Sequence, residues 1–388
     1  MTRPVYILAL AAFAIGTQSY VFAGLLAELA KDLDASISAA GQLMTAFAIT
    51  SAIASPLVVS SLVRFPRRGV LIASLSGVAA LNFASAFLPT YESYLAMRIV
   101  IAITGSAVMP MAGAIAAELT PPEKQGQALG LVLSGLTIAF IAGVPLGTAI
   151  GGYFGWRSTF VFAGVAAALV VPAIYFGVPR STVLLDTSNV QADWSVLKQP
   201  IVLTCLALIG LAFVAAYPVK AFIGPLITEL TGFEGSSIAV MQSAIGFGSL
   251  LGLVVGSRLA DARSFVSNMR EMFLVLTIAL AAWSFLFTFL EVRSMTAIGL
   301  TFVTTLISSA ALIAPSPAIE KALVRAAPDQ SSLTLALNTS TIYLGQGIGA
   351  ALGGIVIASS GYWAIGFAGA VVASLALFLA WLGPEENR

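Results

Sequence analysis

Residues 5–26 read VYILALAAFAIGTQSYVFAGLL, a run of 22 residues without a single charged side chain. A helix needs about 20 mostly apolar residues to cross the hydrocarbon core of a bilayer, so this stretch predicts a membrane span. Ala12-Phe13-Ala14 resembles a signal-peptide cleavage site. The apolar segment nevertheless continues to Leu29, further than the core of a signal peptide normally extends.

Eleven more stretches of the same kind follow along the chain. They are continuous and rich in Ala, Leu and Gly, whereas strands of a membrane barrel alternate between apolar and polar residues. The sequence therefore predicts an all-α membrane protein with twelve spans. The predicted spans cover residues 5–26, 39–60, 70–89, 94–117, 127–150, 157–178, 200–223, 237–257, 271–290, 296–317, 331–355 and 361–382.

The composition of the whole chain agrees with a location in the bilayer. Of 388 residues, 59% are apolar and 9% are charged, whereas soluble domains average roughly 45–50% and 25%. The net charge of +1 argues against a nucleic-acid partner. With Cys205 as the single cysteine and no histidine, we expect no disulfide framework, no thiolate or histidine metal site and no cofactor held by such ligands.

The basic residues predict the orientation of the chain. With a cytoplasmic N-terminus, 13 of the 18 Lys and Arg residues fall in cytoplasmic connections or termini, as the positive-inside rule requires. We therefore expect an inner (plasma) membrane protein with both termini in the cytoplasm. The longest polar break separates spans six and seven. It divides the chain into an N-terminal bundle (1–178), a cytoplasmic linker (179–199) and a C-terminal bundle (200–388).

The two halves of the chain resemble each other. The segment Leu25–Leu29 is similar to Leu226–Leu230, at an offset of 201 positions. Because each half has six spans, the repeat is parallel and relates two bundles about an axis along the membrane normal. This arrangement predicts a polar cavity between the bundles and transport by alternating access. Since one chain supplies both bundles, we expect a monomer to be sufficient.

The fifth predicted span carries a motif of glycines around a proline. It comprises Gly135, Gly143-Val144-Pro145-Leu146-Gly147-Thr148, Gly151-Gly152 and Gly155-Trp156-Arg157. The motif closely resembles the signature of drug:proton antiporters of the major facilitator superfamily, in particular the arabinose-efflux-permease-like and purine-efflux-like branch. The resemblance implies a major facilitator fold, export of a small organic molecule in exchange for protons, and a contribution to multidrug resistance.

Two groups of residues are candidates for gating. Gly143, Gly147 and Gly151 share one helix face and Pro145 permits a kink, which suits either a moving seam or simple tight packing. The loop between spans two and three carries basic residues, and its second-half copy carries an acid. These residues, which form either a cytoplasmic gate or a plain positive-inside cluster, are Arg64, Arg67, Arg68 and Asp261.

Two charged residues fall inside predicted spans. Arg98 matches the fourth-span arginine that the resemblance implicates in proton coupling. Lys220 corresponds to Ser19 at the offset of 201, and relatives often carry an acid where this chain has Ser19. Buried lysines can release a proton whereas arginines effectively cannot, so Lys220 is a candidate for coupling, for anion binding, or for both. The alternative for either residue is an anchor at the membrane interface.

Other polar residues within spans are candidates for the lining of the cavity, since polar side chains avoid lipid. They are Gln18, Gln42, Tyr217, Gln242, Asn338 and Gln346, and each could instead join helices by hydrogen bonds. The basic cavity favours an anionic, zwitterionic or amphiphilic substrate. The alternative is an importer or facilitator of an organic anion with the same fold. An enzyme is not expected, because no nucleophile, acid pair or metal cluster lies at membrane depth.

Overall fold

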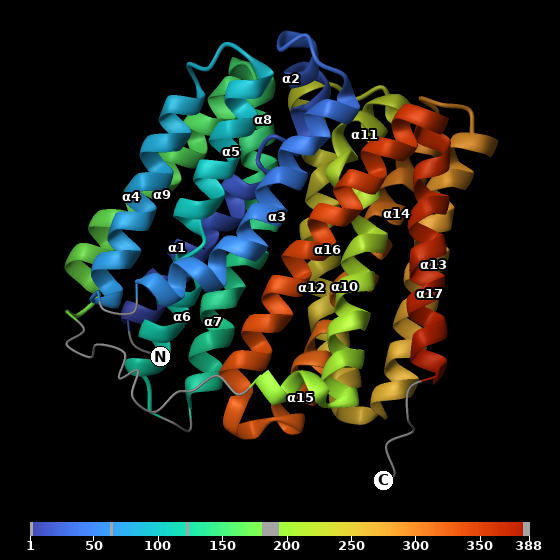
Figure 1. The fold of residues 1–388 in the computed structure, drawn as a ribbon. Coiled ribbons are helices and arrows are strands. Elements are labelled where there is room, and N and C mark those ends of the chain that lie inside the picture. Colours follow the sequence, from blue (N-terminus) through green and yellow to red (C-terminus); the bar gives the residue numbers. More distant parts are fainter. Residues whose placement is uncertain (1–2, 63–64, 122–123, 181–193, 383–388) are drawn as a thin grey trace.

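The computed structural model describes residues 3–62, 65–121, 124–180 and 194–382. Within them, twelve helical segments are long and apolar enough to cross a membrane, which confirms the predicted spans. Figure 1 shows two side-by-side bundles, with both ends of the described chain at one end of the molecule. We call that end the terminal side and the opposite end the far side.

The first bundle contains six spans, of which the first, fourth and fifth are interrupted. Span one comprises α1 (Arg3–Tyr20), η1 (Ala23–Leu25) and α2 (Leu26–Asp32), and spans two and three are α3 (Ile37–Ser61) and α4 (Arg67–Ser85). Span four comprises α5 (Tyr91–Gly105) and α6 (Val108–Glu118). Span five comprises α7 (Gln125–Ile138), η3 (Ala139–Gly143) and α8 (Val144–Phe154), and span six is α9 (Arg157–Gly177).

The second bundle also has six spans, and its first and fourth are again interrupted, whereas span eleven, the counterpart of span five, is one continuous helix. After η4 (Trp194–Lys198), span seven comprises α10 (Pro200–Ala221) and α11 (Ile223–Thr231). Span eight comprises η5 (Gly235–Ser237) and α12 (Ile238–Ala262), and span nine is α13 (Phe265–Phe289). Span ten comprises α14 (Met295–Ile313) and α15 (Ser316–Ala326); η6 (Pro328–Gln330) and α16 (Ser331–Ser360) form span eleven, and η7 (Tyr362–Ala364) and α17 (Ile365–Leu382) form span twelve. The predicted linker lies mostly in 181–193, outside the described residues.

Span one is longer than its predicted apolar run. The prediction ended it at residue 26, but the span continues to Asp32, because charged residues such as Glu28 interrupt the apolar run without ending the helix. In span seven the apolar helix Pro200–Ala221 confirms the predicted 200–223, and the short helix α11 continues it to Thr231. In α11 Glu229 lies on an exposed face, while Ile227 and Leu230 on the opposite face are buried, so this helix is amphipathic.

Buried apolar side chains join the bundles at the far side. One cluster runs through the second bundle and continues into the far-side part of the first through Phe22, Leu26 and Phe160. Another cluster is confined to the first bundle and includes Leu8 and Leu75. Because the shared cluster lies toward the far side, the bundles are closed against each other there.

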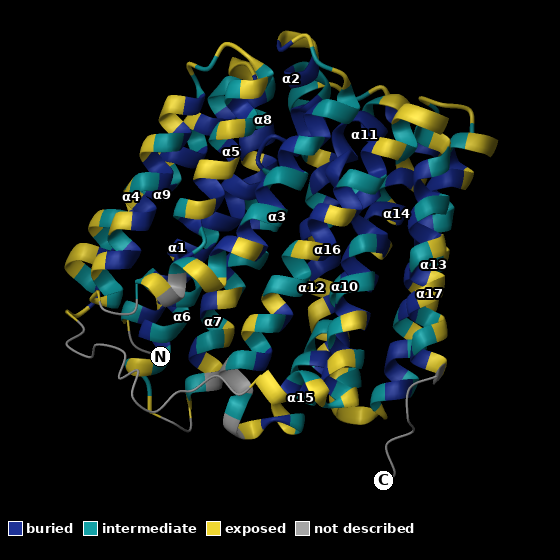
Figure 2. Ribbon diagram, in the orientation of Figure 1, coloured by how far each residue is buried: buried dark blue, intermediate teal, exposed yellow. Residues whose placement is uncertain are grey.

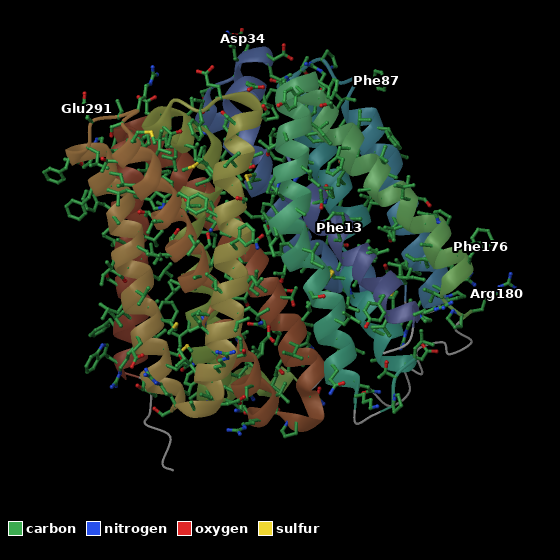
Figure 3. The ribbon with its side chains drawn as sticks, turned by 180° about the vertical axis from the view of Figure 1, so that it is seen from behind. Phe13, Asp34, Phe87, Phe176, Arg180 and Glu291 are labelled. Carbon is green, nitrogen blue, oxygen red and sulfur yellow. The ribbon has the colours of Figure 1, made fainter. Side chains whose placement is uncertain are left out.

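The perimeter of the molecule is apolar. Figure 2 shows exposed and intermediate residues along the outer faces of the helices, with buried residues between them. Phe87 and Phe176 are 85% and 84% exposed, and Figure 3 shows both pointing away from the first bundle. A surface of this kind is unfavourable in water and suits contact with lipid.

Candidate functional site

Spans one and seven break at corresponding positions. Helix α1 ends at Tyr20 before η1, and α10 ends at Ala221 before α11 begins at Ile223. Ser19 and Lys220 therefore each stand just before a break. Discontinuous helices in equivalent places of two repeats are typical of the binding region in secondary transporters, because broken helices expose backbone groups.

A pocket lies between the bundles beside these breaks. Its lining comes from Ser19, Tyr20, Met44, Phe47, Ala48, Tyr217 and Gln346, whose side chains close around it so tightly that no space for a water molecule remains. The Tyr20 hydroxyl donates to Gln346 Oε1 at 2.5 Å and accepts from the Tyr217 hydroxyl at 3.0 Å. Three side chains from α1, α10 and α16 thus form a hydrogen-bonded chain across the interface.

Arg98 lies behind this pocket in the first bundle, with no exposed surface. Its guanidinium donates to the carbonyl oxygens of Gln18 at 3.2 Å and Ser19 at 3.0 Å, and to Gln18 Oε1 at 3.3 Å. The Phe22 and Phe47 rings lie 4.9 and 4.4 Å from the guanidinium carbon, within the range of cation–π attraction. Full burial shows that the alternative of an interfacial anchor was wrong for Arg98.

Lys220 is the corresponding cation of the second bundle, but it stands on span seven. It lies 11 residues before the end of α11 at Thr231. Its Nζ donates to the hydroxyl of Ser309 on α14, and the side chain is partly buried. The lysine thus ends on a neighbouring helix of its own bundle.

The two bundles hold these cations in a reversed arrangement. In the first bundle the fourth span carries the cation, Arg98, which contacts the first span. In the second bundle the first span carries it, Lys220, which contacts the fourth span. Among the described residues neither cation forms an ion pair with a carboxylate. Positive charge therefore flanks the pocket without an acidic partner.

The other predicted polar residues lie at or near the interface. Gln242 Oε1 accepts from Thr148 in the first bundle at 2.6 Å. Gln42 lies against Gly354 of α16, since a Cβ on that glycine would be 2.7 Å from Gln42 Nε2. Asn338 is 2% exposed on α16. Gln42 and Gln242 thus join the bundles at the far side rather than line the pocket.

The glycines of span five pack inside the first bundle. Cβ atoms on Gly143, Gly147 and Gly151 would overlap side chains of span one, namely Thr17, Val21 and Leu25. Pro145 follows the π-helical segment η3 at the start of α8, which accommodates the missing backbone donor. Close packing of α8 on span one is therefore the arrangement seen. Different residues of span five, such as Gly152, contact the second bundle.

The predicted gating charges form contacts within single bundles. Arg67 pairs with Glu118 at 3.3 Å, and Arg68 donates to the Tyr175 carbonyl. Asp261 pairs with Lys321 at 2.5 Å. Arg64 lies outside the described residues. The described pairs hold helix ends on the terminal side of each bundle.

Several residues at this site escaped the sequence analysis. Tyr20 and Ser309 make the central contacts, and Tyr343 of α16 packs against the cluster formed by Phe47 and Ile101 in the first bundle. Tyr20 directly follows Ser19, and its phenol within an apolar run was a usable signal. Ser309 had none, since hydroxyl residues occur throughout the spans.

Known proteins resemble this chain along most of its length. The model of the Major Facilitator Superfamily matches residues 8–318. The inner membrane transport protein YdhP of Escherichia coli (strain K12) is 30% identical over 385 residues, covering 99% of this chain and 96% of that protein. The chloramphenicol resistance protein of Streptomyces lividans is 32% identical over 266 residues, covering 68% of each.

The fold also resembles solved structures. A bacterial homologue of the human lysosomal transporter Spinster, in its inward-facing and unoccupied conformation, has a TM-score of 0.78 and 17% sequence identity, with coverage of 98% of this chain and 96% of that one. Two six-helix bundles that meet at a central interface are the architecture of a secondary transporter rather than an enzyme. The chain belongs to the major facilitator superfamily.

Proposed function

We propose that this transporter exports a small organic molecule in exchange for protons by alternating access. The observation that carries the proposal is the pair of cations, Arg98 and Lys220, that flank the interface pocket without acidic partners. Such a field favours an anionic, zwitterionic or amphiphilic substrate over a cation. The chloramphenicol resistance protein among the relatives supports export and a role in drug resistance.

Lys220 is the coupling group in this proposal. Of its three ammonium donors one contacts Ser309, so its charge is weakly stabilised, whereas Arg98 is held by three hydrogen bonds. Binding of an anion favours the charged lysine, and loss of its proton favours release. Arg98, which cannot readily lose a proton, keeps a fixed charge behind the pocket.

The terminal side is cytoplasmic in this proposal, and residues 179–199 form the linker between domains 1–178 and 200–388. The described positive charges near that side include Arg67, Arg68, Lys198, Arg258 and Lys321, in accord with the positive-inside rule. The relative in E. coli is an inner membrane protein, which supports the same location here. The transporter then works as a monomer, and the contacts between the two bundles at the far side form its outer gate.

Proton exchange can be measured in inside-out vesicles with an acidified lumen and the dye acridine orange. Addition of a small organic anion, such as the test acid 3-phenylpropanoate, is expected to release protons and restore the fluorescence if the anion is a substrate. Lys220→Glu should abolish this response, because it reverses the charge beside the pocket. Lys31→Glu, at an exposed position of α2, is the matched control and should respond like the wild type.

Two results would contradict the proposal. An undiminished response of Lys220→Glu would exclude Lys220 from coupling. Accumulation of the acid that does not depend on the imposed pH gradient would instead support the alternative, an importer or facilitator of an organic anion.

A further inference from the structure

Two acidic side chains from different bundles lie at the far-side contact. Glu28 belongs to the first turn of α2 in the first bundle, and Glu234 directly precedes η5 in the second bundle. Figure 1 shows α2 at the far side, where the two bundles meet. The two carboxylates are close enough for their charges to interact. The contact that closes the far side therefore brings like charges together.

Glu28 is held against the backbone of the second bundle. Its carboxylate accepts a hydrogen bond from the backbone N–H of Gly235, and a Cβ on that glycine would lie 3.9 Å from Glu28 Oε1. Gly235 has a φ of +53°, in the left-handed region that favours glycine. The side chain of Glu28 is half-buried, whereas that of Glu234 is exposed. Closure thus removes part of the water around the Glu28 carboxylate.

The backbone at Gly235 is also pressed against the first bundle. A Cβ on Gly152 of α8 would overlap the backbone of Gly235 and Ser236. Backbone atoms of the two bundles therefore meet directly beside the two acids. Repulsion between Glu28 and Glu234 acts on the same contact that joins the bundles.

No basic side chain neutralises the two acids by direct pairing. Among the described residues, neither Glu28 nor Glu234 forms an ion pair. Of the elements packed against α2, η1 and α3 carry no ionisable side chain. The other ionisable groups around this contact are exposed or paired with one another, namely Glu229 on α11, Tyr153 on α8, Lys31, Asp34, Arg293 beside Gly232, and the pair of Asp32 with Arg157. Of the charged groups in the described chain, Glu234 is the one that acts on Glu28.

We infer that Glu28 and Glu234 form a proton-sensitive latch, which makes closure of the far side depend on the pH of the solvent there. With both carboxylates charged, their repulsion favours separation of the bundles. A proton on Glu28 removes the repulsion, and the neutral group can still accept from Gly235 through its carbonyl oxygen. The closed state therefore holds this proton more tightly than the open state. By linkage, acid at the far side favours closure.

The latch regulates the outer gate and does not carry protons across the membrane. Its proton comes from the far-side solvent and returns to the same side when the bundles separate. This inference goes beyond the proposed function, because it concerns the gate and involves neither Lys220 nor a substrate.

The distance between the bundles at controlled pH tests the latch. Nitroxide labels on Phe87→Cys and Met295→Cys, which are 85% and 83% exposed at the far side of different bundles, leave every acid in place. Double electron–electron resonance is recorded on the purified protein, without substrate, from about pH 8 to about pH 4.5, where carboxylates take up protons. The ratio of closed to open molecules should rise about threefold or more as the pH falls.

Neutral variants assign this response to the two acids. Glu28→Gln keeps an acceptor for the Gly235 N–H but carries no charge, so it should remain in the closed distribution at every pH. Glu234→Gln should raise the closed population at high pH and reduce the response. Glu229→Gln is the matched control, because Glu229 corresponds to Glu28 at the offset of 201 and is exposed. It should respond like the wild type.

Three results would overturn the latch. They are a wild-type distribution that does not change with pH, a full response that survives in Glu28→Gln, and loss of the response in Glu229→Gln as well as in Glu28→Gln. Because the measurement needs no substrate, each of these results leaves the proposed export and the role of Lys220 to the vesicle assay.

Discussion

Arg98 replaces hydrogen bonds that the broken helix of span one lacks. In a continuous helix the carbonyls of Gln18 and Ser19 would accept from the amides four positions later, but α1 ends at Tyr20. The guanidinium supplies both carbonyls with donors at 3.2 and 3.0 Å. It thereby fixes the backbone that positions Tyr20 against Gln346 and Tyr217.

Replacement of Arg98 should therefore lower stability as well as transport. Arg98→Met leaves two buried carbonyls without donors, and each lost hydrogen bond to a charged group costs about 1.5–3 kcal/mol. Arg98→Lys should fall between this variant and the wild type, because an ammonium cannot reproduce the planar guanidinium. Thermal unfolding in detergent measures the effect. Unfolding of Arg98→Met at the wild-type temperature would refute the role.

The sequence predicted element types better than element ends. Long apolar runs cannot be buried in water, so the twelve spans followed from composition, and the 201-residue offset correctly paired Ser19 with Lys220 beside two helix breaks. The extension of span one to Asp32 was missed because charged residues interrupt its apolar run. The partner of Lys220 was missed because one chain gives no information on which of many hydroxyls lies opposite.

The sequence allowed two interpretations of the glycines of span five, a moving contact or simple tight packing, and only their neighbours in the structure distinguish which glycines are packed against another helix. A Cβ on Gly135 of α7 would overlap the carbonyl of Ala9 in α1, while one on Gly130 of the same helix meets nothing within 4 Å. The first position is therefore essential for contact between helices, and the second is free. Spacing alone does not distinguish them, since it records which face a residue occupies and not what lies against it.

A matched pair of alanine variants tests whether Gly135 and Gly130 differ in how tightly α7 packs at these positions. Gly135→Ala should destabilise the protein by about 1–3 kcal/mol, as overpacking does when backbone must shift. Gly130→Ala should be neutral or slightly stabilising, because alanine favours a helix over glycine by up to about 1 kcal/mol. Thermal unfolding of both variants in the same detergent is the measurement. Equal effects at the two positions would contradict the packing argument.

Backbone contacts join the bundles near the middle of the membrane spans and at the far side. A Cβ on Gly246 of α12 would overlap the backbone of Ile141 in η3, and one on Gly152 of α8 would overlap the backbone of Ser236. Backbone cannot move aside as the end of a side chain can. An added methyl group should therefore separate the bundles while each keeps its own core.

Gly246→Ala should accordingly shift the population from closed to open at the far side. Nitroxide labels on Glu92→Cys and Met295→Cys, exposed far-side positions of the two bundles, report their separation by double electron–electron resonance. Cys205 is buried and can be kept. Gly246→Ala should add a longer distance to the distribution, whereas the control Gly299→Ala, with nothing within 4 Å of its Cβ, should not. A distribution unchanged by Gly246→Ala would show that the glycine contact does not hold the far side closed.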